Sequence, residues 1–411
     1  MADETCRACG ARLGGAVIDL GTTPLCESFV SAERYNVGEP IYPLRAYVCA
    51  TCFLVQLGVF VRPEDIFTEY AYFSSFSDSW VRHAARYAET MRARFALGPR
   101  NLVVEIGSND GYLLQHFVAA GVPVLGIDPA ANVAEAARAR GVTTLVRFFG
   151  RAVADEVVAE GRRADLIAGN NVLAQVPDLH DVVAGLARLL SPRGVVTIEV
   201  PHLLRLIEGH QFDTIYHEHF SYFSLRTLMR VFARHGLRCF DVEELESHGG
   251  SLRIFVCHAD DATHPTAASV AAIEDAEQRA GLEDMATYVA FAERVRETKR
   301  ALLTFLIEAK RAGKSIAGYG APGKGNTLLN YCGVGTDFLD YTVDRNPYKH
   351  GRFLPGSRIP IFAPEHVAAT RPDYLLVLPW NLTREIVEQM AHIRSWGGKF
   401  VIPIPTVQVV P

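Results

Sequence analysis

The feature that most restricts the fold is a strand, a glycine turn and a helix within residues 101–117. The apolar run Leu102–Ile106 predicts a buried strand, and Gly107 and Gly111 allow a tight turn in which the backbone approaches a ligand closely. A second apolar run ends at Asp128, about twenty residues past the turn. A carboxylate there can accept hydrogen bonds from both ribose hydroxyls of a nucleoside. We therefore expect an α/β protein with a nucleoside-binding sheet edge.

The composition of the glycine turn discriminates between two classes of nucleoside cofactor. Dinucleotide-binding turns have the pattern GxGxxG, in which the glycines admit a pyrophosphate. Here the pattern is Glu105-x-Gly107-x-Asn109-Asp110-Gly111, with an acid inside the turn. Asp110 would repel a pyrophosphate but suits the cationic sulfonium and ammonium groups of S-adenosylmethionine (SAM). The turn therefore favours SAM over a dinucleotide.

Four later segments predict further strands: Ala164–Asn171, Val195–His202, Leu237–Leu245 and Ser251–His258. The first ends in Asn170 and Asn171, at the edge where such a cofactor lies. A turn at Ser191–Gly194 precedes the second. The last two are expected to pair antiparallel through His248–Ser251, which is either a simple turn or places His248 and Ser251 toward the ligand.

The stretch Asp213–Phe223 contains four adjacent polar side chains, Tyr216, His217, Glu218 and His219. A helix would splay these side chains around its circumference and a strand would alternate them between two faces. A loop at the lip of a pocket can converge several of them. The alternative is a polar loop whose histidines satisfy neighbouring carbonyls. Its place downstream of the cofactor turn favours a catalytic role.

Two CxxC pairs, Cys6/Cys9 and Cys49/Cys52, predict a zinc site. Each pair forms a knuckle with both thiolates facing one point, and two knuckles complete the tetrahedral shell that zinc favours. Four cysteines leave no open coordination position, so the zinc should be structural. The spacer predicts strands at Ala16–Leu20 and Tyr42–Tyr47, and Cys26 between the pairs predicts a small buried residue.

A second glycine loop lies in the C-terminal part, after helical sequence at residues 265–310. Ser315–Tyr319 predicts a strand, and Gly320, Gly323 and Gly325 surround Lys324 before a helix that contains Asn326. Backbone N–H groups, a helix N-terminus and a positive charge suit a phosphate. The lysine spacing excludes a P-loop. NAD is the rival ligand, but a second cofactor fold in one chain favours a nucleotide-linked acceptor. Further strands are expected around Asp337–Asp344, Tyr374–Leu378 and Lys399–Ile404.

The 411 residues allow two or three domains. We expect a zinc-binding module at 1–66, a SAM-binding domain at 67–265 and a Rossmann-like domain for a nucleotide-linked acceptor at 266–411. The aromatic segment 69–77 either closes over a ligand or packs between domains, and helical periodicity follows at Trp80–Met91.

The overall composition excludes several other classes. A net charge of −5 gives no reason to expect nucleic-acid binding. The N-terminus lacks the pattern of a signal peptide and no apolar run reaches the length of a membrane helix, so the expectation is a cytoplasmic protein with reduced cysteines. We expect a monomer or a weak homo-oligomer.

In this order of motifs the chain resembles, along nearly its whole length, the SAM-dependent sugar C-methyltransferases of deoxysugar biosynthesis. The resemblance rests on the two CxxC pairs, Glu105–Gly111, Tyr216–His219, His248–Ser251 and Gly318–Gly325. Members of the family methylate a ring carbon next to the ketone of a nucleotide-linked 4-keto-6-deoxysugar, usually a thymidine diphosphate (dTDP) sugar. The resemblance implies a zinc module, a class I methyltransferase domain and a second Rossmann-like domain.

The resemblance also implies roles for individual residues. His219 would be the base, Tyr216 and Glu218 would place the substrate, and Tyr70 would lie near the donor. Gln175 departs from the family, which commonly has histidine there. Glutamine can hydrogen-bond but cannot titrate near neutral pH, which puts an assisting role in proton handling in doubt.

The candidate residues fall into four groups. The donor candidates are Tyr70, Glu105, Gly107, Asn109, Asp110, Gly111, Asp128 and Asn170. The substrate candidates are His248, Ser251, Gly320, Lys324, Gly325 and Asn326. The catalytic candidates are Tyr216, His217, Glu218 and His219, and the zinc ligands are Cys6, Cys9, Cys49 and Cys52.

Carbon methylation next to a ketone explains why a histidine cluster is needed. A base must remove a ring proton to give an enolate, and a histidine can do so near neutral pH. Donors such as Tyr216 and His217 would stabilise the enolate oxygen, and Glu218 would orient an imidazole or bind a sugar hydroxyl. By pattern alone His217 and His219 could exchange roles. The rivals are an O- or N-methyltransferase and a non-catalytic zinc protein that binds a nucleotide sugar.

Overall fold

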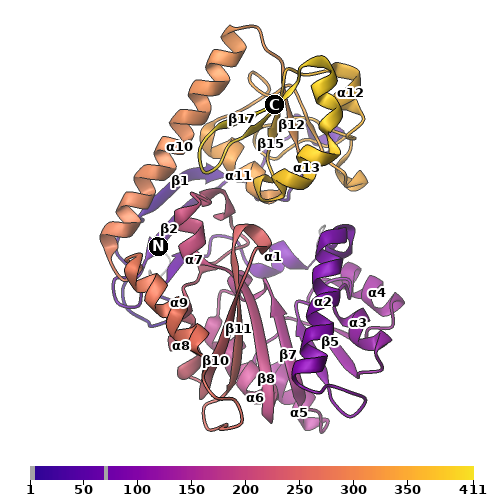
Figure 1. Cartoon of the computed structure of the whole chain (residues 1–411), viewed down its shortest axis with the longest axis vertical. Helices are drawn as coiled ribbons and strands as arrows, with labels where there is room; N and C mark the ends of the chain where they lie inside the picture. The colour runs from indigo at the N-terminus through magenta and orange to yellow at the C-terminus, as the bar shows by residue number, and fades with distance from the viewer. Residues whose placement is uncertain (1–4, 69–72) are drawn as a thin grey trace.

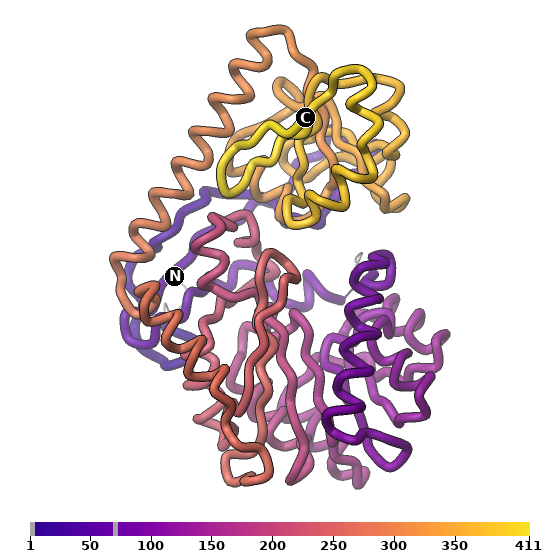
Figure 2. The backbone as a smooth tube through the Cα atoms, in the orientation of Figure 1, coloured from indigo at the N-terminus to yellow at the C-terminus, as the bar shows by residue number. Residues whose placement is uncertain are grey.

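A computed structural model describes residues 5–68 and 73–411, and these residues form two lobes with three β-sheets (Figure 1). The larger lobe contains the central sheet and the smaller lobe contains the C-terminal sheet. The N-terminal segment runs between the two lobes beside the long helix α10, Met285–Arg311 (Figure 2). None of the helices in the described parts of the chain is long and apolar enough to cross a membrane.

The central sheet has seven strands in the order β10-β11-β8-β7-β4-β5-β6. They are β4 (Val103–Ile106), β5 (Val124–Asp128), β6 (Thr144–Val146), β7 (Ala164–Asn170), β8 (Leu190–Pro201), β10 (Leu237–Leu245) and β11 (Ser251–His258). Strands β4 to β8 run parallel, whereas β11 pairs antiparallel with both β8 and β10. Because β4 lies between β5 and β7, the carboxyl ends of β4 and β7 form the switch point where open α/β sheets bind ligands.

The sequence-predicted strands of this sheet are confirmed, but the turn predicted at Ser191–Gly194 is wrong. Those residues lie inside β8, whose first residue Leu190 already pairs with Ala164 of β7. The register shifts before the next pair, Leu166 and Val195. The irregularity absorbs the proline and glycine that suggested a turn.

Helices cover the central sheet on both faces (Figure 1). They are α2 (Asp78–Arg94), α3 (Leu114–Ala119), α4 (Ala131–Ala139), α5 (Arg151–Ala159), α6 (Leu179–Leu189), α8 (Leu225–Ala233) and α9 (Ala268–Arg279). The expected helix at Trp80–Met91 lies within α2, where the Ser77 side chain accepts a hydrogen bond from the backbone N–H of Trp80 and caps the helix. The short helices α1 (Pro63–Phe67) and α7 (Leu203–Glu208) lie in connections.

The N-terminal sheet has the order β1-β2-β3-β9 and is not built from the zinc segment alone. Its strands are β1 (Ile18–Thr23), β2 (Tyr42–Val48), β3 (Val55–Leu57) and β9 (Ser221–Tyr222). Strand β9 directly follows the Tyr216–His219 stretch and pairs antiparallel with β3. The zinc segment and the candidate catalytic stretch therefore share one sheet.

The C-terminal sheet has the order β14-β13-β12-β15-β16-β17, parallel except for the last strand. Its strands are β12 (Ile316–Tyr319), β13 (Thr342–Val343), β14 (Ile361–Phe362), β15 (Tyr374–Val377), β16 (Lys399–Ile402) and β17 (Gln408–Val410). The helices of this lobe are α11 (Gly323–Cys332), α12 (His366–Thr370) and α13 (Thr383–Gln389). The second Rossmann-like unit is thus present, with a shorter β13 than the sequence suggested.

Eight 3₁₀ turns connect these elements within the described residues. They are η1 (Ala32–Arg34), η2 (Ser74–Phe76), η3 (Leu173–Gln175), η4 (Phe212–Thr214), η5 (Ser247–Gly249), η6 (Pro347–Lys349), η7 (Trp380–Leu382) and η8 (Ala391–Trp396). Four of them, η3, η4, η5 and η7, contribute residues to the candidate site.

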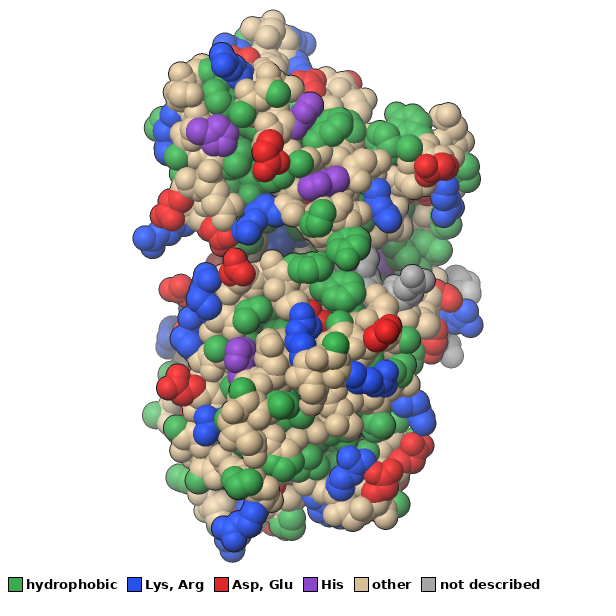
Figure 3. All heavy atoms as spheres, turned by 90° about the vertical axis from the view of Figure 1, so that its right-hand side faces the viewer, with side chains coloured by type: hydrophobic (Ala, Val, Ile, Leu, Met, Phe, Trp, Pro, Cys, Tyr) green, Lys and Arg blue, Asp and Glu red, His purple; other side chains and the backbone are tan. Residues whose placement is uncertain are grey.

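One hydrophobic core joins the lobes. It contains Leu44 of β2, Leu203 of α7, Tyr288 and Leu302 of α10, and Leu328 of α11. Buried apolar contacts of this kind lower the free energy of the packed arrangement by about 25 cal/mol per Å². In the space-filling view the lobes meet along a seam with hydrophobic side chains beside it (Figure 3). The packing fixes the two lobes relative to each other and places their loops at a common seam.

Candidate active site

The glycine turn after β4 has the backbone conformation that its sequence requires. Gly107 and Gly111 have φ of 67° and 78°, and Asn109 between them has φ of 47°, also in the left-handed region. A side chain at Gly107 would come within 2.9 Å of the Val172 side chain. The turn is therefore closed tightly over the end of β4, as expected for a backbone that approaches a ligand.

Asp128 ends β5 and is tied to this turn. Its Oδ2 accepts a hydrogen bond from Asn109 N at 2.9 Å, and its Oδ1 accepts one from Ala130 N at 2.9 Å. Burial raises its pKa, whereas the two backbone hydrogen bonds lower it. A carboxylate has further lone pairs, so Asp128 can hold the turn and still accept a ribose hydroxyl.

The donor edge is rich in buried carboxylates. Glu105 is fully buried, and burial raises its pKa well above the usual value while Asp128 and Asp110 raise it further. Asp110 is also buried, forms an ion pair with Arg140 at 3.2 Å and accepts hydrogen bonds from Ser75. The ion pair means that Asp110 brings less free charge than its sequence position suggested.

Several buried polar atoms at this edge have no hydrogen-bond partner within the described residues. They include Oδ1 of Asp110, Oγ of Ser108, Oδ1 of Asn171 and the whole side-chain amide of Asn170. Buried polar groups are normally paired, so an unpaired set at a ligand crevice indicates a bound polar molecule. The surplus of carboxylates over cations fits a positively charged ligand such as SAM.

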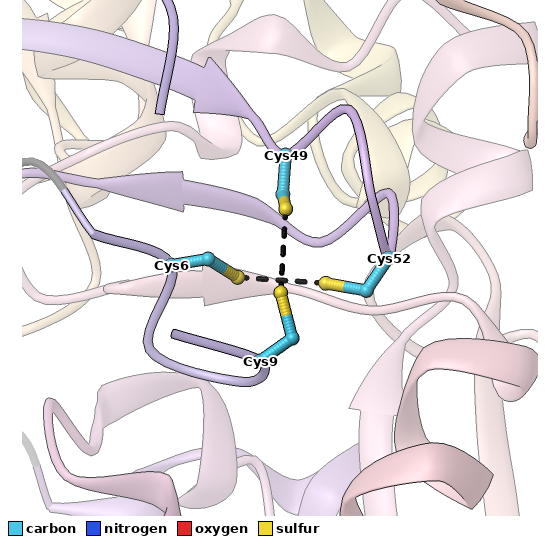
Figure 4. Close-up of side chains that lie close together, drawn as sticks. All are labelled: Cys6, Cys9, Cys49 and Cys52. Atoms are coloured by element: carbon cyan, nitrogen blue, oxygen red, sulfur yellow. Dashed lines mark hydrogen bonds between the residues drawn. The ribbon is translucent and has the colours of Figure 1, made fainter. Parts of the chain in front are cut away.

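The four cysteines of the CxxC pairs point toward one centre (Figure 4). Cys6 Sγ lies 3.4 Å from Cys52 Sγ, Cys9 Sγ lies 3.5 Å from Cys49 Sγ, and all four sulfurs lie within 4.8 Å of one another. Sulfurs about 2.3 Å from a tetrahedral zinc ion are roughly 3.8 Å apart. The cluster therefore fits Zn²⁺ with a full shell, which makes the metal structural.

The candidate catalytic stretch converges fewer side chains than expected. His219 and Tyr216 are half-buried and their rings lie 4.2 Å apart, whereas His217 and Glu218 are buried. His217 Nε2–H donates to the carbonyl oxygen of Pro43 on β2 at 3.1 Å, and its Nδ1 is buried with no hydrogen-bond partner among the described residues. The structure thus gives His217 the carbonyl contact of the alternative interpretation, and the neutral ring has no second N–H for an enolate oxygen.

Glu218 faces the N-terminal segment. Its Oε1 lies 3.5 Å from the Sγ of Cys26, which can donate to it. Cys26 is buried, and burial together with Glu218 raises its pKa well above the usual value, so the thiol keeps its proton. Glu218 is therefore buried against the N-terminal segment.

His219 is held in one tautomer. Its Nδ1 lies 3.2 Å from the carbonyl oxygen of Thr214, and because a carbonyl only accepts, Nδ1 carries the proton. Nε2 then has a free lone pair. Burial lowers the pKa of His219 to about 4, and the ammonium of Lys324 contributes to the lowering. The imidazole is therefore neutral and able to accept a proton at neutral pH.

His248 lies in a strained turn between β10 and β11. Its φ is 55°, its side chain is half-buried, and its Nε2 lies 3.1 Å from the amide nitrogen of Asn171, whose φ is 57°. Because an amide nitrogen only donates, Nε2 accepts and Nδ1 carries the proton. Ser251 is buried and donates to Ser247 O at 2.9 Å, so its hydroxyl proton is used within the turn, whereas His248 keeps its Nδ1–H for a ligand.

Gly249 allows a close approach between this turn and the C-terminal lobe. Its φ is 89°, and an added side chain would come within 2.7 Å of the Trp380 ring. The Gln211 side chain donates to Gly249 O at 2.8 Å. The turn therefore carries His248 to the seam between the lobes.

A network that the sequence analysis missed joins the lobes at this seam. Trp380 Nε1 donates to Asp213 Oδ2 at 2.7 Å, and Lys324 Nζ donates to Asn381 Oδ1 at 2.7 Å and lies 4.7 Å from the Trp380 ring centre. Burial raises the pKa of Asp213 to about 6 and lowers that of Lys324 to about 8. The only local sign of this network in the sequence is the pair Trp380-Asn381, which comes soon after a predicted strand.

Electrostatic coupling places three of these groups in one region. The Lys324 charge lowers the pKa of both His219 and His248, and His219 lowers that of His248, which burial reduces to about 4. Two neutral imidazoles, one with a free lone pair and one with a free N–H, thus lie near one cation of the C-terminal lobe. This arrangement suits proton removal next to a polarised oxygen.

Comparison with known proteins identifies the family. Three family models match: one described as a zinc binding domain over residues 6–67, one as a methyltransferase domain over 80–242, and one as a C-methyltransferase C-terminal domain over 246–405. The C-methyltransferase NovU of Streptomyces niveus is 39% identical over 410 residues, which cover 99% of this chain and 97% of that protein. The chain belongs to the C-methyltransferase family.

Two further matches cover only part of this C-methyltransferase. Trans-aconitate 2-methyltransferase of Methylobacterium radiotolerans is 33% identical over 135 residues, 32% of this chain and 48% of that protein. The solved structure of the glycopeptide N-methyltransferase MtfA with SAM covers 48% of this chain and 99% of its own, with 14% identity and a TM-score of 0.34. The family assignment establishes a SAM-dependent C-methyltransferase with a zinc-binding N-terminal domain.

The C-terminal glycine loop of the C-methyltransferase is less open to a phosphate than predicted. Ala321 N donates to Asp344 Oδ2 at 2.7 Å, and Glu27 accepts a hydrogen bond from the backbone of Gly323. Both carboxylates compete with a phosphate for the loop N–H groups. Among the predicted phosphate-binding residues, Lys324 places its ammonium group at the seam, beside Asn381 and Trp380.

The other loop candidates have packing contacts. Gly320 and Gly325 lie where an added side chain would come within 2.5 Å of Pro379 and 2.9 Å of Leu378. Asn326 is buried and donates to Cys26 O at 2.6 Å. Gly320 and Gly325 therefore allow close packing within the C-terminal lobe. Asn326 holds this lobe against the N-terminal segment.

Tyr70 is expected near the donor, but it lies outside the described residues. The nearby Ser74 N donates to Asn109 Oδ1 at 2.9 Å, so the segment that follows Tyr70 packs on the glycine turn.

Gln175 ends η3, in which Ala174 O accepts a hydrogen bond from Phe220 N at 2.7 Å. The position that departs from the family thus borders the catalytic stretch.

Proposed function

We propose that this C-methyltransferase methylates C3 of a dTDP-linked 4-keto-6-deoxysugar, next to the ketone. The observation that carries the proposal is the neutral His219, with its proton on Nδ1 and a free lone pair on Nε2. Carbon methylation next to a ketone requires such a base, whereas methylation of an oxygen or nitrogen needs no enolate to be stabilised.

The proposed reaction begins with proton transfer to His219. Nε2 takes the ring proton, the C–H bond breaks, and its electron pair forms an enolate with the neighbouring ketone. SAM supplies an electrophilic methyl group on a positively charged sulfur. The Thr214 carbonyl stabilises the resulting imidazolium, because Nδ1–H donates to it. The low pKa of the free enzyme's His219 keeps the base unprotonated until the substrate arrives.

Two neutral donors are assigned to the enolate oxygen. His248 offers Nδ1–H, with Nε2 held by Asn171, and Tyr216 keeps its phenolic proton because burial raises its pKa well above the usual value. Removing one such donor typically costs a factor of about 10² to 10³ in turnover. Lys324 supplies a positive charge for the enolate or for the diphosphate of the substrate.

The donor is proposed to bind at the carboxyl edge of β4, β5 and β7. Asp128 would accept its ribose hydroxyls, and Glu105 would face its positive charge. Asn109, Asp110 and Asn170 complete the edge.

A zinc site made of four thiolates requires reduced cysteines, and none of the eight cysteines forms a disulfide. We therefore propose that the protein acts in the cytoplasm. We also propose that it is a monomer or a weak homo-oligomer.

The test uses the full-length protein with SAM and a panel of 4-keto sugar nucleotides in deuterated water. Mass spectrometry and NMR of the product should show one added methyl group on carbon and loss of one carbon-bound hydrogen. A methylated product that retains every carbon-bound hydrogen would refute the enolate mechanism. A product only from sugars linked to another nucleotide would refute the dTDP assignment.

A further inference from the structure

Arg7 lies between the zinc ligands Cys6 and Cys9 and extends toward the catalytic stretch. Its guanidinium donates to the carbonyl oxygens of Phe220 and Leu57 and to Ser221 Oγ, the last at 3.2 Å. It also lies 5.6 Å from the centre of the Phe220 ring. One side chain of the zinc knuckle thus contacts the two residues that directly follow His219.

The backbone of Phe220 is held from both sides. Its N–H donates to Ala174 O at 2.7 Å, and its carbonyl accepts from Arg7 and from Leu57 N, the latter at 3.0 Å. The next residue, Ser221, begins strand β9 and pairs with Gln56 of β3. Because His219 is bonded to Phe220, the direction of its side chain depends on these contacts.

The zinc knuckle is the fixed end of this connection. Gly10 N donates to Cys6 O at 2.8 Å, and Cys6 N donates to Ala11 O at 2.8 Å, so the loop folds back on itself. Arg7 N donates to Gln56 Oε1 at 3.1 Å. Four thiolates pulled to one metal ion hold both ends of the Cys6–Cys9 loop, and Arg7 projects from it.

The charge of Arg7 is compensated by the metal site rather than by an acid. Among the described residues no carboxylate forms an ion pair with Arg7 or accepts a hydrogen bond from it, and Arg7 directly follows the zinc ligand Cys6 in the chain. Four thiolates around a divalent ion leave a net negative charge. The guanidinium fork can therefore be used for three backbone and hydroxyl acceptors.

We infer that Arg7 is a positioning residue for His219 and that the zinc site serves catalysis by fixing Arg7. The inference rests on the proposed role of His219 as the base. It assigns the zinc domain a function beyond local folding. Loss of the Arg7 fork removes the side-chain hydrogen bond to Phe220 O and leaves the one from Leu57 N, and a displacement of about 1 Å at a reacting group can cost as much as a hundredfold in rate.

The experiment compares wild type with Arg7→Gln, Arg7→Lys and the control Arg12→Gln. Arg12 is exposed and lies in the same segment, three residues after Cys9. For each protein we would measure zinc content, SAM affinity by calorimetry, kcat and KM, and hydrogen–deuterium exchange at the ring carbon without methyl transfer. Arg7→Lys keeps the charge but not the fork, so it separates the two contributions and remains informative where Arg7→Gln does not fold.

The expected result for Arg7→Gln is a fall of about tenfold to a hundredfold in kcat and in ring-carbon exchange. Zinc content, SAM affinity and KM should stay within about twofold, Arg7→Lys should be intermediate, and Arg12→Gln should match wild type. Full kcat in Arg7→Gln, or a loss of zinc and SAM binding in parallel with kcat in both variants, would overturn the inference. A wild type inactive on every 4-keto sugar nucleotide would instead refute the proposed function, and the inference with it.

Discussion

The substitution Lys324→Gln tests how the charge of the C-terminal lobe controls His219, the proposed catalytic base. Burial and Lys324 lower the pKa of His219 from 6.5 to about 4. At about 1.36 kcal/mol per unit of pKa, protonating His219 here costs roughly 3 kcal/mol more than in water. Because burial is the larger cause, removing the ammonium should raise the pKa only part of the way back to 6.5.

The same residue should also set the alkaline limit of activity. Burial lowers the pKa of Lys324 to about 8, and Asp213 acts in the opposite direction. The base must be deprotonated and the lysine protonated, so wild-type kcat/KM should rise through about pH 4, level off and fall above about pH 8. The fall corresponds to loss of the charge that contacts the substrate anion or the enolate.

The assay is the pH profile of kcat/KM for both proteins, with the methylated sugar measured by mass spectrometry at each pH. In Lys324→Gln the maximum should be lower, the alkaline fall should disappear, and the acid limb should move upward from about pH 4 while staying below 6.5. A wild-type acid limb near 6.5, or an alkaline fall that persists without Lys324, would refute the electrostatic coupling.

Three further substitutions test single groups. His219→Asn should lower turnover by a factor of about 10² to 10⁴ with SAM affinity unchanged by calorimetry, and unchanged turnover would place the base elsewhere. Glu105→Gln should weaken SAM binding by roughly tenfold or more, since a hydrogen bond to a charged group contributes about 1.5–3 kcal/mol; equal affinity would contradict the charge argument. Asp213 has a pKa raised to about 6, so its charge destabilises the fold above that pH and not below about 4. Asp213→Asn should therefore raise Tm at pH 7.5 and lose this advantage at pH 4, whereas a Tm deficit that is the same at both pH values would contradict the shift.

Local sequence patterns predicted the elements whose residues are close together in the chain. The strand, turn and helix around Gly107 and the four zinc ligands are of this kind, since periodicity and spacing act over a few residues. The conformation of the Gly107 turn and the convergence of the four sulfurs agree with those predictions. The individual catalytic roles stay predictions.

Contacts between distant segments could not be predicted in the same way. Strand β9 has two residues and pairs with β3 about 165 positions earlier in the chain, so no periodicity marks it. The Trp380–Asp213 hydrogen bond joins separate lobes. Glu27 and Asp344 fill the glycine loop with carboxylates, which depends on packing between the N-terminal segment and the C-terminal lobe.

The same distant contacts explain why a methyltransferase sheet alone would not complete the site. The central sheet supplies the donor edge and His248, whereas His219 is oriented by Thr214 and its following strand belongs to the N-terminal sheet. The C-terminal lobe supplies Lys324, whose charge reaches both imidazoles. Removing either outer unit would leave the donor edge intact but would free the base or its electrostatic partner. Donor binding and methyl transfer should therefore be separable by substitutions at the seam, where the proposed mechanism uses residues held by all three sheets.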